Sequence, residues 1–199
     1  MGERKGRNFI FWLDLECTGS EDDDDVLELG ASITDRDLNE LDYRSIVFPA
    51  LPDMLENMKP VVTEMHTKNG LLEDVKALGL VSSPMERQMI LGAADEELAA
   101  WVRSLAGGDH MLFAGSGVAH YDRKYIKRDF PQLNDRLTHF ALDIGTTRRI
   151  SEFGGLQFPE SHYDKTHRAL DDARMHCNEM RVYVKWVKEA IAMGMDHVL

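Results

Sequence analysis

A short apolar run near the N-terminus ends in two acidic residues, and it constrains the fold more than any other stretch. The sequence FIFWLDLE, residues 9–16, predicts a buried strand that carries Asp14 and Glu16 at its C-terminal end. Side chains alternate between the two faces of a strand, so both carboxylates lie on one face with Cα atoms about 6.5–7 Å apart. Leu13 and Leu15 point to the opposite face.

Two carboxylates at this spacing repel each other, and the repulsion raises one of their pKa values. A divalent cation between them removes that penalty, and hard oxygen ligands suit Mg²⁺ or Mn²⁺. Asp14 and Glu16 are therefore candidate metal ligands. The alternative for this pair alone is two solvent-facing acids at the end of a strand.

The bulk composition favours one globular domain of residues 1–199, with a core over about residues 9–188 and a short flexible C-terminal tail. The formal net charge of −12 argues against a broad basic face for long nucleic acid, but a short nucleic acid end can be held through metal ions. No apolar run approaches the roughly 18 residues of a membrane span. Cys17 and Cys177 have no paired spacing, and no signal peptide is recognised, so a cytoplasmic protein is expected.

Strands dominate the first part of the chain, and helices alternate with short strands afterwards. Residues 26–34 and 41–49 follow the first strand at hairpin distances, which predicts three consecutive antiparallel strands. Two short strands, expected to be parallel, lie within 110–117 and 138–146. This order is typical of an α/β fold in which helices flank a mixed sheet and ligands bind beyond the carboxyl ends of the strands.

Start and stop residues divide the rest of the chain into helices. Pro60 and Ser83-Pro84 start helices, whereas Gly70 and the Gly-Gly pair at 107–108 interrupt or end them. Residues 151–166 are polar, contain Gly and Pro, and predict a loop. The predicted helical segments are 53–78 in pieces, 83–108, 118–130 and about 167–192.

Further candidate residues occur where two of these helices begin. Asp122 lies in the first turns of a helix that follows a strand, and His167 precedes Asp172 by five residues. Five helical residues turn through about 500°, so His167 and Asp172 can share a site only if His167 lies before the helix or in its first turn. The alternatives are favourable charge at a helix N-terminus for Asp171 and Asp172, and a surface histidine for His167.

Five motifs occur in the order found in the DEDDh family of 3′→5′ exonucleases. They are DLECTG, HTKNGLL, GSGVAHYDRKYI, the LD pair at 142–143, and HRALDD. The chain resembles this family over about residues 9–188, and within the family it looks most like the oligoribonucleases. The resemblance implies a ribonuclease H-like fold and, by analogy with relatives, a homodimer.

The resemblance also implies a catalytic set. The metal-binding acids of the family fall on Asp14, Glu16, Asp122 and Asp172, and its general base falls on His167. In such a site two divalent ions, Mg²⁺ or Mn²⁺, lie about 3.5–4 Å apart beside the scissile phosphate. A histidine with an ordinary pKa near 6.5 accepts the proton of the attacking water around neutral pH. The implied reaction is hydrolysis of short single-stranded oligonucleotides, RNA before DNA, to nucleoside 5′-monophosphates.

Substrate contacts are expected from five further residues. Two lie in the turn after the first strand, one matches a substrate-contacting histidine of the family, one lies near Asp122, and one falls near the tyrosine that caps the substrate's 5′ phosphate across the dimer. In that order they are Thr18 and Gly19, His66, Ser116, and His139.

Two other substrate positions depart from the oligoribonuclease pattern. Ser20 stands where those enzymes carry an apolar residue that wedges between bases, and Val61 stands where they carry a tryptophan. The sequence therefore leaves two alternatives open. One is a broader or proofreading-type exonuclease acting on single-stranded DNA or RNA, and the other is a non-catalytic nucleotide-binding module.

Overall fold

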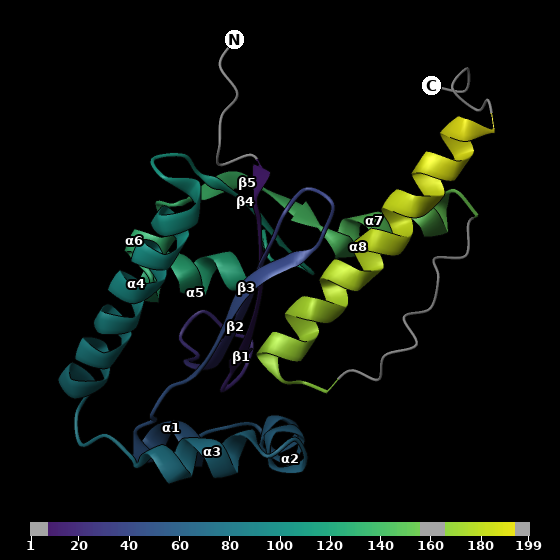
Figure 1. The fold of residues 1–199 in the computed structure, drawn as a ribbon. Helices are drawn as coiled ribbons and strands as arrows, with labels where there is room; N and C mark the ends of the chain where they lie inside the picture. Colours follow the sequence, from purple (N-terminus) through teal and green to yellow (C-terminus); the bar gives the residue numbers. More distant parts are fainter. Residues whose placement is uncertain (1–7, 156–165, 194–199) are drawn as a thin grey trace.

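A five-stranded mixed sheet forms the centre of the computed structural model (Figure 1). The strand order is β3-β2-β1-β4-β5, in which the first three strands along the chain pair antiparallel and the last two run parallel to β1. This arrangement confirms the predicted mixed sheet. The strands are β1 (Ile10–Cys17), β2 (Val26–Thr34), β3 (Glu40–Val47), β4 (Met111–Gly115) and β5 (Leu137–Asp143).

The structure describes residues 8–155 and 166–193, and these ranges contain eight helices. None of these helices has the length and apolar composition needed to cross a membrane. The helices are α1 (Pro52–Glu56), α2 (Pro60–Lys68), α3 (Leu71–Leu78), α4 (Pro84–Ala106), α5 (Asp122–Asp129), α6 (Pro131–Asn134), α7 (Ile144–Phe153) and α8 (Ala169–Ala192).

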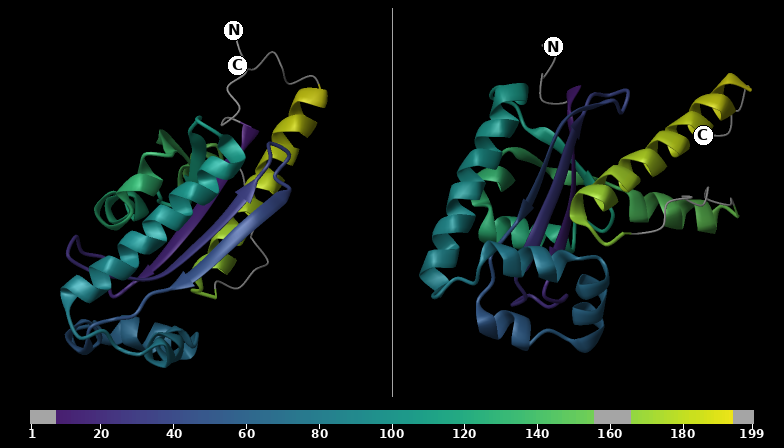
Figure 2. Two further views of the ribbon diagram at one scale, coloured as in Figure 1. Left: turned by 60° about the vertical axis from the view of Figure 1, so that its left-hand side comes forward. Right: turned by 60° about the horizontal axis from the view of Figure 1, so that its bottom comes forward.

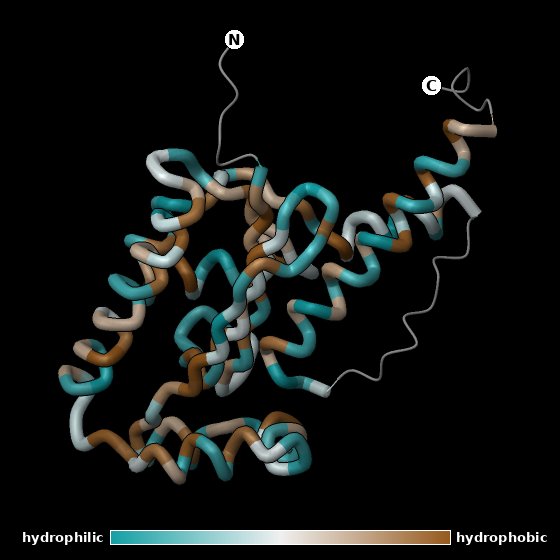
Figure 3. Tube along the Cα trace, viewed as in Figure 1, coloured by the Kyte–Doolittle hydropathy of each residue, from teal (hydrophilic) through white to brown (hydrophobic). Residues whose placement is uncertain are grey.

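Helices cover both faces of the sheet (Figure 2). On one face, α4, α5 and α6 pack over a core that includes Phe11 and Leu13 of β1. On the other face, Ile10 and Trp12 of β1 pack against α8, along which apolar and hydrophilic residues alternate (Figure 3). The strand's period of two therefore places Asp14 and Glu16 on the face that α8 covers.

A smaller group of helices, α1 to α3, lies beyond the end of the sheet where β1 finishes (Figure 1). Its own apolar cluster joins Leu71, Leu72 and Val75 of α3 to Leu27 of β2. The group therefore borders the tip of β1, close to the beginning of α8.

The helix predictions were correct for α4, where the Ser83 hydroxyl caps the first turn by accepting a hydrogen bond from the Glu86 amide at 3.2 Å. The predicted loop is wrong for residues 151–153, which continue α7, and its residues 156–165 lie outside the described ranges. Helix α7 was not predicted from the sequence because Asp143 has two roles. It ends β5, and its side chain accepts a hydrogen bond from the Thr146 amide at 3.1 Å to start the helix at once.

Candidate active site

A pocket of about 420 Å³ opens at the edge of the sheet where β1, β4 and β5 present their carboxyl ends. Parallel strands place such a pocket at this edge because the segments that follow them diverge there. Four chain segments contribute to it: the end of β1, the loop after β4 with the start of α5, helix α7, and the segment that leads into α8. The polar and charged lining residues are Asp14, Glu16, Ser116, Tyr121, Asp122, Arg148, Arg149 and His167.

Glu16, His167 and Asp172 come closest to a metal-binding arrangement among the described residues. One potential ligand atom of each lies within 4.8 Å of those of the other two. Glu16 and Asp172 are only 6% and 1% exposed, and carboxylates buried this deeply require compensating charge or hydrogen bonds. With Asp14 and Asp122 lining the same pocket, the donor set is rich in carboxylate oxygens and fits a hard divalent cation.

The beginning of α8 approaches the sheet at Gly30 of β2, beside the acidic end of β1. Gly30 is the register partner of Asp14, and a Cβ atom built on Gly30 would lie 2.0 Å from the Leu170 amide nitrogen and 2.1 Å from the Ala169 carbonyl carbon. The first turn of α8 therefore rests on the backbone of β2. This close approach brings Asp172 over the acids of β1.

His167 lies before α8, as the helical geometry required for a site shared with Asp172. The helix starts at Ala169, and Asp172 lies in its first turn. His176, one helical turn after Asp172, is 1% exposed and places its Nδ1 3.9 Å from an oxygen of Asp14. The sequence analysis missed His176, although its i+4 spacing from Asp172 puts both on the face of α8 toward the sheet.

The start of α7 adds two arginines that the sequence analysis also missed. Arg148 donates to the Ser116 hydroxyl at 3.1 Å and pairs with the carboxylate of Glu179 on α8. Arg149 lines the same pocket and is exposed. The Thr-Thr-Arg-Arg run belongs to the site because Asp143 starts a helix directly after β5, and this helix carries both arginines to the pocket.

A second, mostly apolar pocket of about 290 Å³ adjoins the first. Val61, Val62 and Met65 of α2 form one side, and the shared wall contains Glu16, Asp122 and Tyr121. Tyr121 is 49% exposed and precedes α5 directly. An apolar hollow next to a carboxylate cluster offers space for a flat, apolar group beside a metal-bound one.

His66 is fully buried beneath the tip of β1, and not a surface residue. Its Nε2 lies 2.9 Å from the Cys17 carbonyl oxygen, which can only accept, so Nε2 carries the proton and donates. Burial lowers the pKa of His66, which favours the neutral ring. Nε2 also lies 3.9 Å from a Glu16 oxygen, so His66 supports the strand end that carries Glu16.

Thr18 and Gly19 contact the acidic loop, residues 20–25, that joins β1 to β2. The Thr18 hydroxyl donates to the Asp24 carboxylate at 3.0 Å and accepts from the Asp25 amide at 3.0 Å. Gly19 lines the apolar pocket, but a Cβ on it would lie 2.3 Å from Asp24 Oδ2. A side chain at position 19 would therefore displace the Asp24 carboxylate from its contact with Thr18.

Cys17 follows Glu16 directly, yet it is no candidate nucleophile. Burial raises the pKa of its thiol well above the usual range, and the carboxylates of Asp122, Glu16 and Asp14 raise it further. A thiol in this environment stays protonated and unreactive. The candidate groups for chemistry at this site are therefore the carboxylate oxygens and the imidazole of His167.

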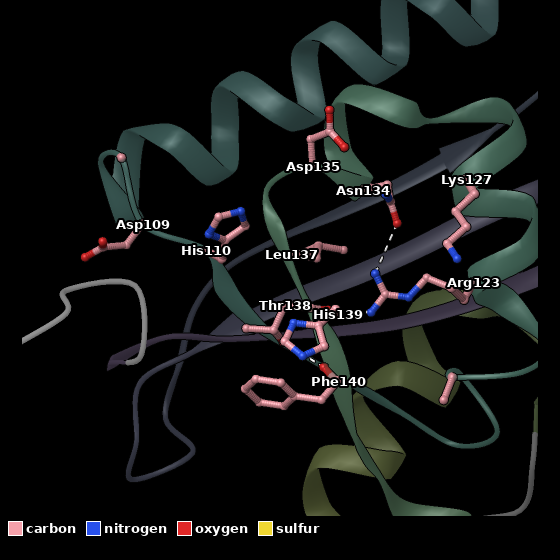
Figure 4. Close-up of a pocket in the computed structure, with 12 residues that line it drawn as sticks. Asp109, His110, Arg123, Lys127, Asn134, Asp135, Leu137, Thr138, His139 and Phe140 are labelled. Carbon is pink, nitrogen blue, oxygen red and sulfur yellow. Dashed lines mark hydrogen bonds between the residues drawn. The ribbon is translucent and has the colours of Figure 1, made fainter.

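His139 does not line the carboxylate pocket of its own chain. Figure 4 shows it in a separate pocket of about 780 Å³, together with His110, Arg123, Lys127 and Asn134. His139 is exposed on β5, the edge strand of the sheet. The contact of His139 with a 5′ phosphate stays a prediction. The substrate contacts expected of Thr18, Gly19, His66 and Ser116 also stay predictions.

Solved structures with a similar fold include two exonuclease I proteins. The chain matches Escherichia coli exonuclease I, in complex with a 5cy-dT13 oligonucleotide, with a TM-score of 0.59 and 15% identity over 96% of this chain and 43% of that one. The match to exonuclease I of Methylocaldum szegediense has a TM-score of 0.59 and 14% identity over 87% of this chain and 39% of that one. The chain thus spans about two fifths of their length, and the likeness establishes the ribonuclease H-like exonuclease fold.

Sequence relatives are closer. Oligoribonuclease of Mycobacterium sp. (strain KMS) is 31% identical over 182 residues, which cover 89% of this chain and 80% of the relative. Oligoribonuclease of Corynebacterium diphtheriae is 32% identical over 179 residues, which cover 87% of this chain and 80% of the relative. The family model of the RNase T exonucleases matches residues 11–180. The chain therefore belongs to the RNase T family of exonucleases.

Proposed function

We propose that the protein is a divalent-metal-dependent 3′→5′ exonuclease that releases nucleoside 5′-monophosphates from short single-stranded oligonucleotides, with RNA preferred over DNA. The observation that carries this proposal is that potential ligand atoms of Glu16, His167 and Asp172 lie within 4.8 Å of one another, while Glu16 and His167 line a pocket together with Asp14 and Asp122. These residues come from three elements far apart in the sequence. The name oligoribonuclease of the relatives supports short RNA as the substrate.

Asp14, Glu16, Asp122 and Asp172 are the residues that would hold the metal ions. When bound, two such ions supply positive charge to the attacking and leaving oxygens of the scissile phosphate. The imidazole nitrogen of His167 that lies within 4.8 Å of the two carboxylates accepts the proton of the attacking water. Proton transfer by a positioned histidine contributes about 10²- to 10⁴-fold to a rate.

The arginines of α7 provide the positive charge that the chain as a whole lacks. With a net charge of −12, the protein as a whole repels a polyanion, so binding of one is favoured by such groups or by bound cations. Arg149 is exposed in the pocket, so we assign it a contact with a substrate phosphate. Arg148 already contacts Ser116 and Glu179 and orders the wall of the pocket.

The apolar pocket beside the carboxylates would receive the 3′-terminal base. Tyr121 stands between the two pockets, and aromatic rings bind bases of any sequence by stacking. Ser20 and Val61 replace the family's wedge and tryptophan, and of the two tyrosines that line this pocket, Tyr121 is exposed whereas Tyr125 is buried.

Replacing Tyr121 with alanine is expected to weaken substrate binding by the loss of one stacked base, about 1–3 kcal/mol. This corresponds to a KM about 5- to 150-fold higher, with a smaller change in kcat, and Tyr121→Phe should restore the wild-type KM. Tyr43→Ala is the matched control, because Tyr43 is also 49% exposed but lies on β3, outside both pockets. Equal KM values for the two alanine variants would contradict the stacking role.

The function is tested by a ladder of labelled RNA and DNA from two to about twenty nucleotides, with Mg²⁺ or Mn²⁺ supplied in turn. The expected result is release of 5′-monophosphates from the 3′ end, fastest for the shortest RNAs. Progressive degradation of the longest DNA would favour the proofreading-type alternative. Tight binding without hydrolysis under either metal would favour the non-catalytic module.

A further inference from the structure

We propose that Arg168, together with Glu28 and Asn69, positions His167 as a general base by fixing the backbone of the two residues, His167 and Arg168, that precede α8. The inference rests on the proposed function, because it names what holds the proton acceptor of that same site. None of these three residues lines the carboxylate pocket, so each would act through His167.

Glu28 of β2 binds the beginning of α8 from the sheet side. It is 1% exposed, and both of its oxygens accept hydrogen bonds from Arg168, with donor distances of 2.9–3.2 Å. The backbone amide of Ala169 donates to the same carboxylate at 3.0 Å. Arg168 is the N-cap residue of α8, but its side chain does not cap the helix. Glu28 of the sheet caps it instead and places a negative charge at the helix N-terminus.

Asn69 holds the same segment from the side of α2 and α3. Its side-chain amide donates to the carbonyl oxygen of His167, while its own oxygen accepts from the Leu71 amide at 3.0 Å. Asp74 of α3 pairs with Arg168 at 2.9 Å. The elbow formed by His167 and Arg168 is thus attached both to the sheet and to the neighbouring helices.

The conformation of His167 explains why such anchoring is needed. His167 has a φ of +52°, in the left-handed region that residues with a side chain rarely adopt. A backbone in this region persists only where surrounding contacts determine it, and such residues cluster at functional sites. If Arg168 or Asn69 loses its contacts, the segment relaxes and the imidazole leaves its place beside Glu16 and Asp172.

The inference is tested by a double-mutant cycle between Arg168→Ala and His167→Ala, with single-turnover hydrolysis of a short RNA in Mn²⁺ as the readout. In the wild-type background, Arg168→Ala should lower the rate about 10- to 100-fold, the effect of displacing a catalytic group by about 1 Å, and leave KM nearly unchanged. In the His167→Ala background the same substitution should change the rate less than about twofold, because the group it positions is gone.

Arg174→Ala is the matched control. Arg174 lies on the same helix and forms an equivalent two-pronged pair with Glu40 of β3, with both donor distances at 2.7 Å, but it does not contact the His167 segment. The single-turnover hydrolysis rate of the Arg174→Ala variant should stay within about twofold of the wild-type rate. A midpoint of urea unfolding for each variant separates lost stability from lost positioning.

Asn69→Asp provides a second, independent probe should Arg168→Ala fail to fold. The aspartate keeps an acceptor for the Leu71 amide but removes the donor to the His167 carbonyl, and it should show the same lack of additivity with His167→Ala. Equal rate losses in both backgrounds would overturn the inference while leaving the proposed function intact. A wild-type rate for His167→Ala alone would overturn the general-base assignment and the inference with it.

Discussion

An Asp172→Asn variant is expected to hydrolyse short oligonucleotides about 10³-fold more slowly than the wild-type protein, a loss of about 4 kcal/mol of transition-state stabilisation. Asp172 is 1% exposed and lies within 4.8 Å of the ligand atoms of Glu16 and His167. Asparagine preserves the shape of the side chain but removes a negative charge, so the site holds a divalent cation less tightly.

The comparison uses Asp171→Asn as its control, because Asp171 is the adjacent acid on α8 but is exposed, and it accepts a 3.3 Å hydrogen bond from the Thr166 hydroxyl. The measurement is the initial rate of 5′-monophosphate release at saturating Mn²⁺. A second readout is the rise in melting temperature on adding Mn²⁺, which should shrink in Asp172→Asn and persist in Asp171→Asn. Equal rates for the two variants would refute the metal-ligand assignment of Asp172.

A Gly30→Ala variant is expected to lose about 1–3 kcal/mol of folding stability and most of its activity. The added Cβ would meet the backbone of Ala169 and Leu170 at 2.0–2.1 Å, and backbone atoms in the first turn of a helix cannot move aside as a flexible side chain can. Helix α8 must therefore shift away from β2. That shift separates Asp172 and His167 from the acids of β1.

Gly92→Ala is the control for this substitution, because nothing lies within 4 Å of the Cβ position on Gly92, in the interior of the exposed face of α4. Alanine there should stabilise the protein by about 1 kcal/mol, the difference in helix propensity. Urea unfolding measures both free energies, and the oligonucleotide assay measures both rates. A Gly30→Ala protein within about 0.5 kcal/mol of the wild type would show that α8 can be moved without effect.

The candidate site could be predicted from the sequence to the extent that its residues lie in local patterns. The period of two along β1 places Asp14 and Glu16 on one face, and the capping pattern at Ser83 predicts the start of α4. The 500° turn between His167 and Asp172 correctly requires His167 to precede the helix. Each of these inferences uses residues that are neighbours along one strand or one helical turn.

Two other features of the site could not be predicted from the sequence. Asp143 ends β5 and starts α7, which hid the helix and with it Arg148 and Arg149. The burial of His66 against the Cys17 carbonyl likewise could not be predicted from the sequence. The Asp143 cap is a local feature that lies within the strand pattern of β5, whereas the burial of His66 arises from the packing of α2 against the end of β1.

The sequence by itself determined that three antiparallel strands precede two short parallel strands along the chain, which face of β1 carries the acids, and which helix beginnings supply Asp122 and Asp172. Only the tertiary structure decided that Gly30 lets α8 approach the sheet, and that His139 faces a different pocket. The physical reason is that strand and helix periods act over a few residues, whereas distances between elements depend on how side chains and backbone fill space between segments more than a hundred residues apart.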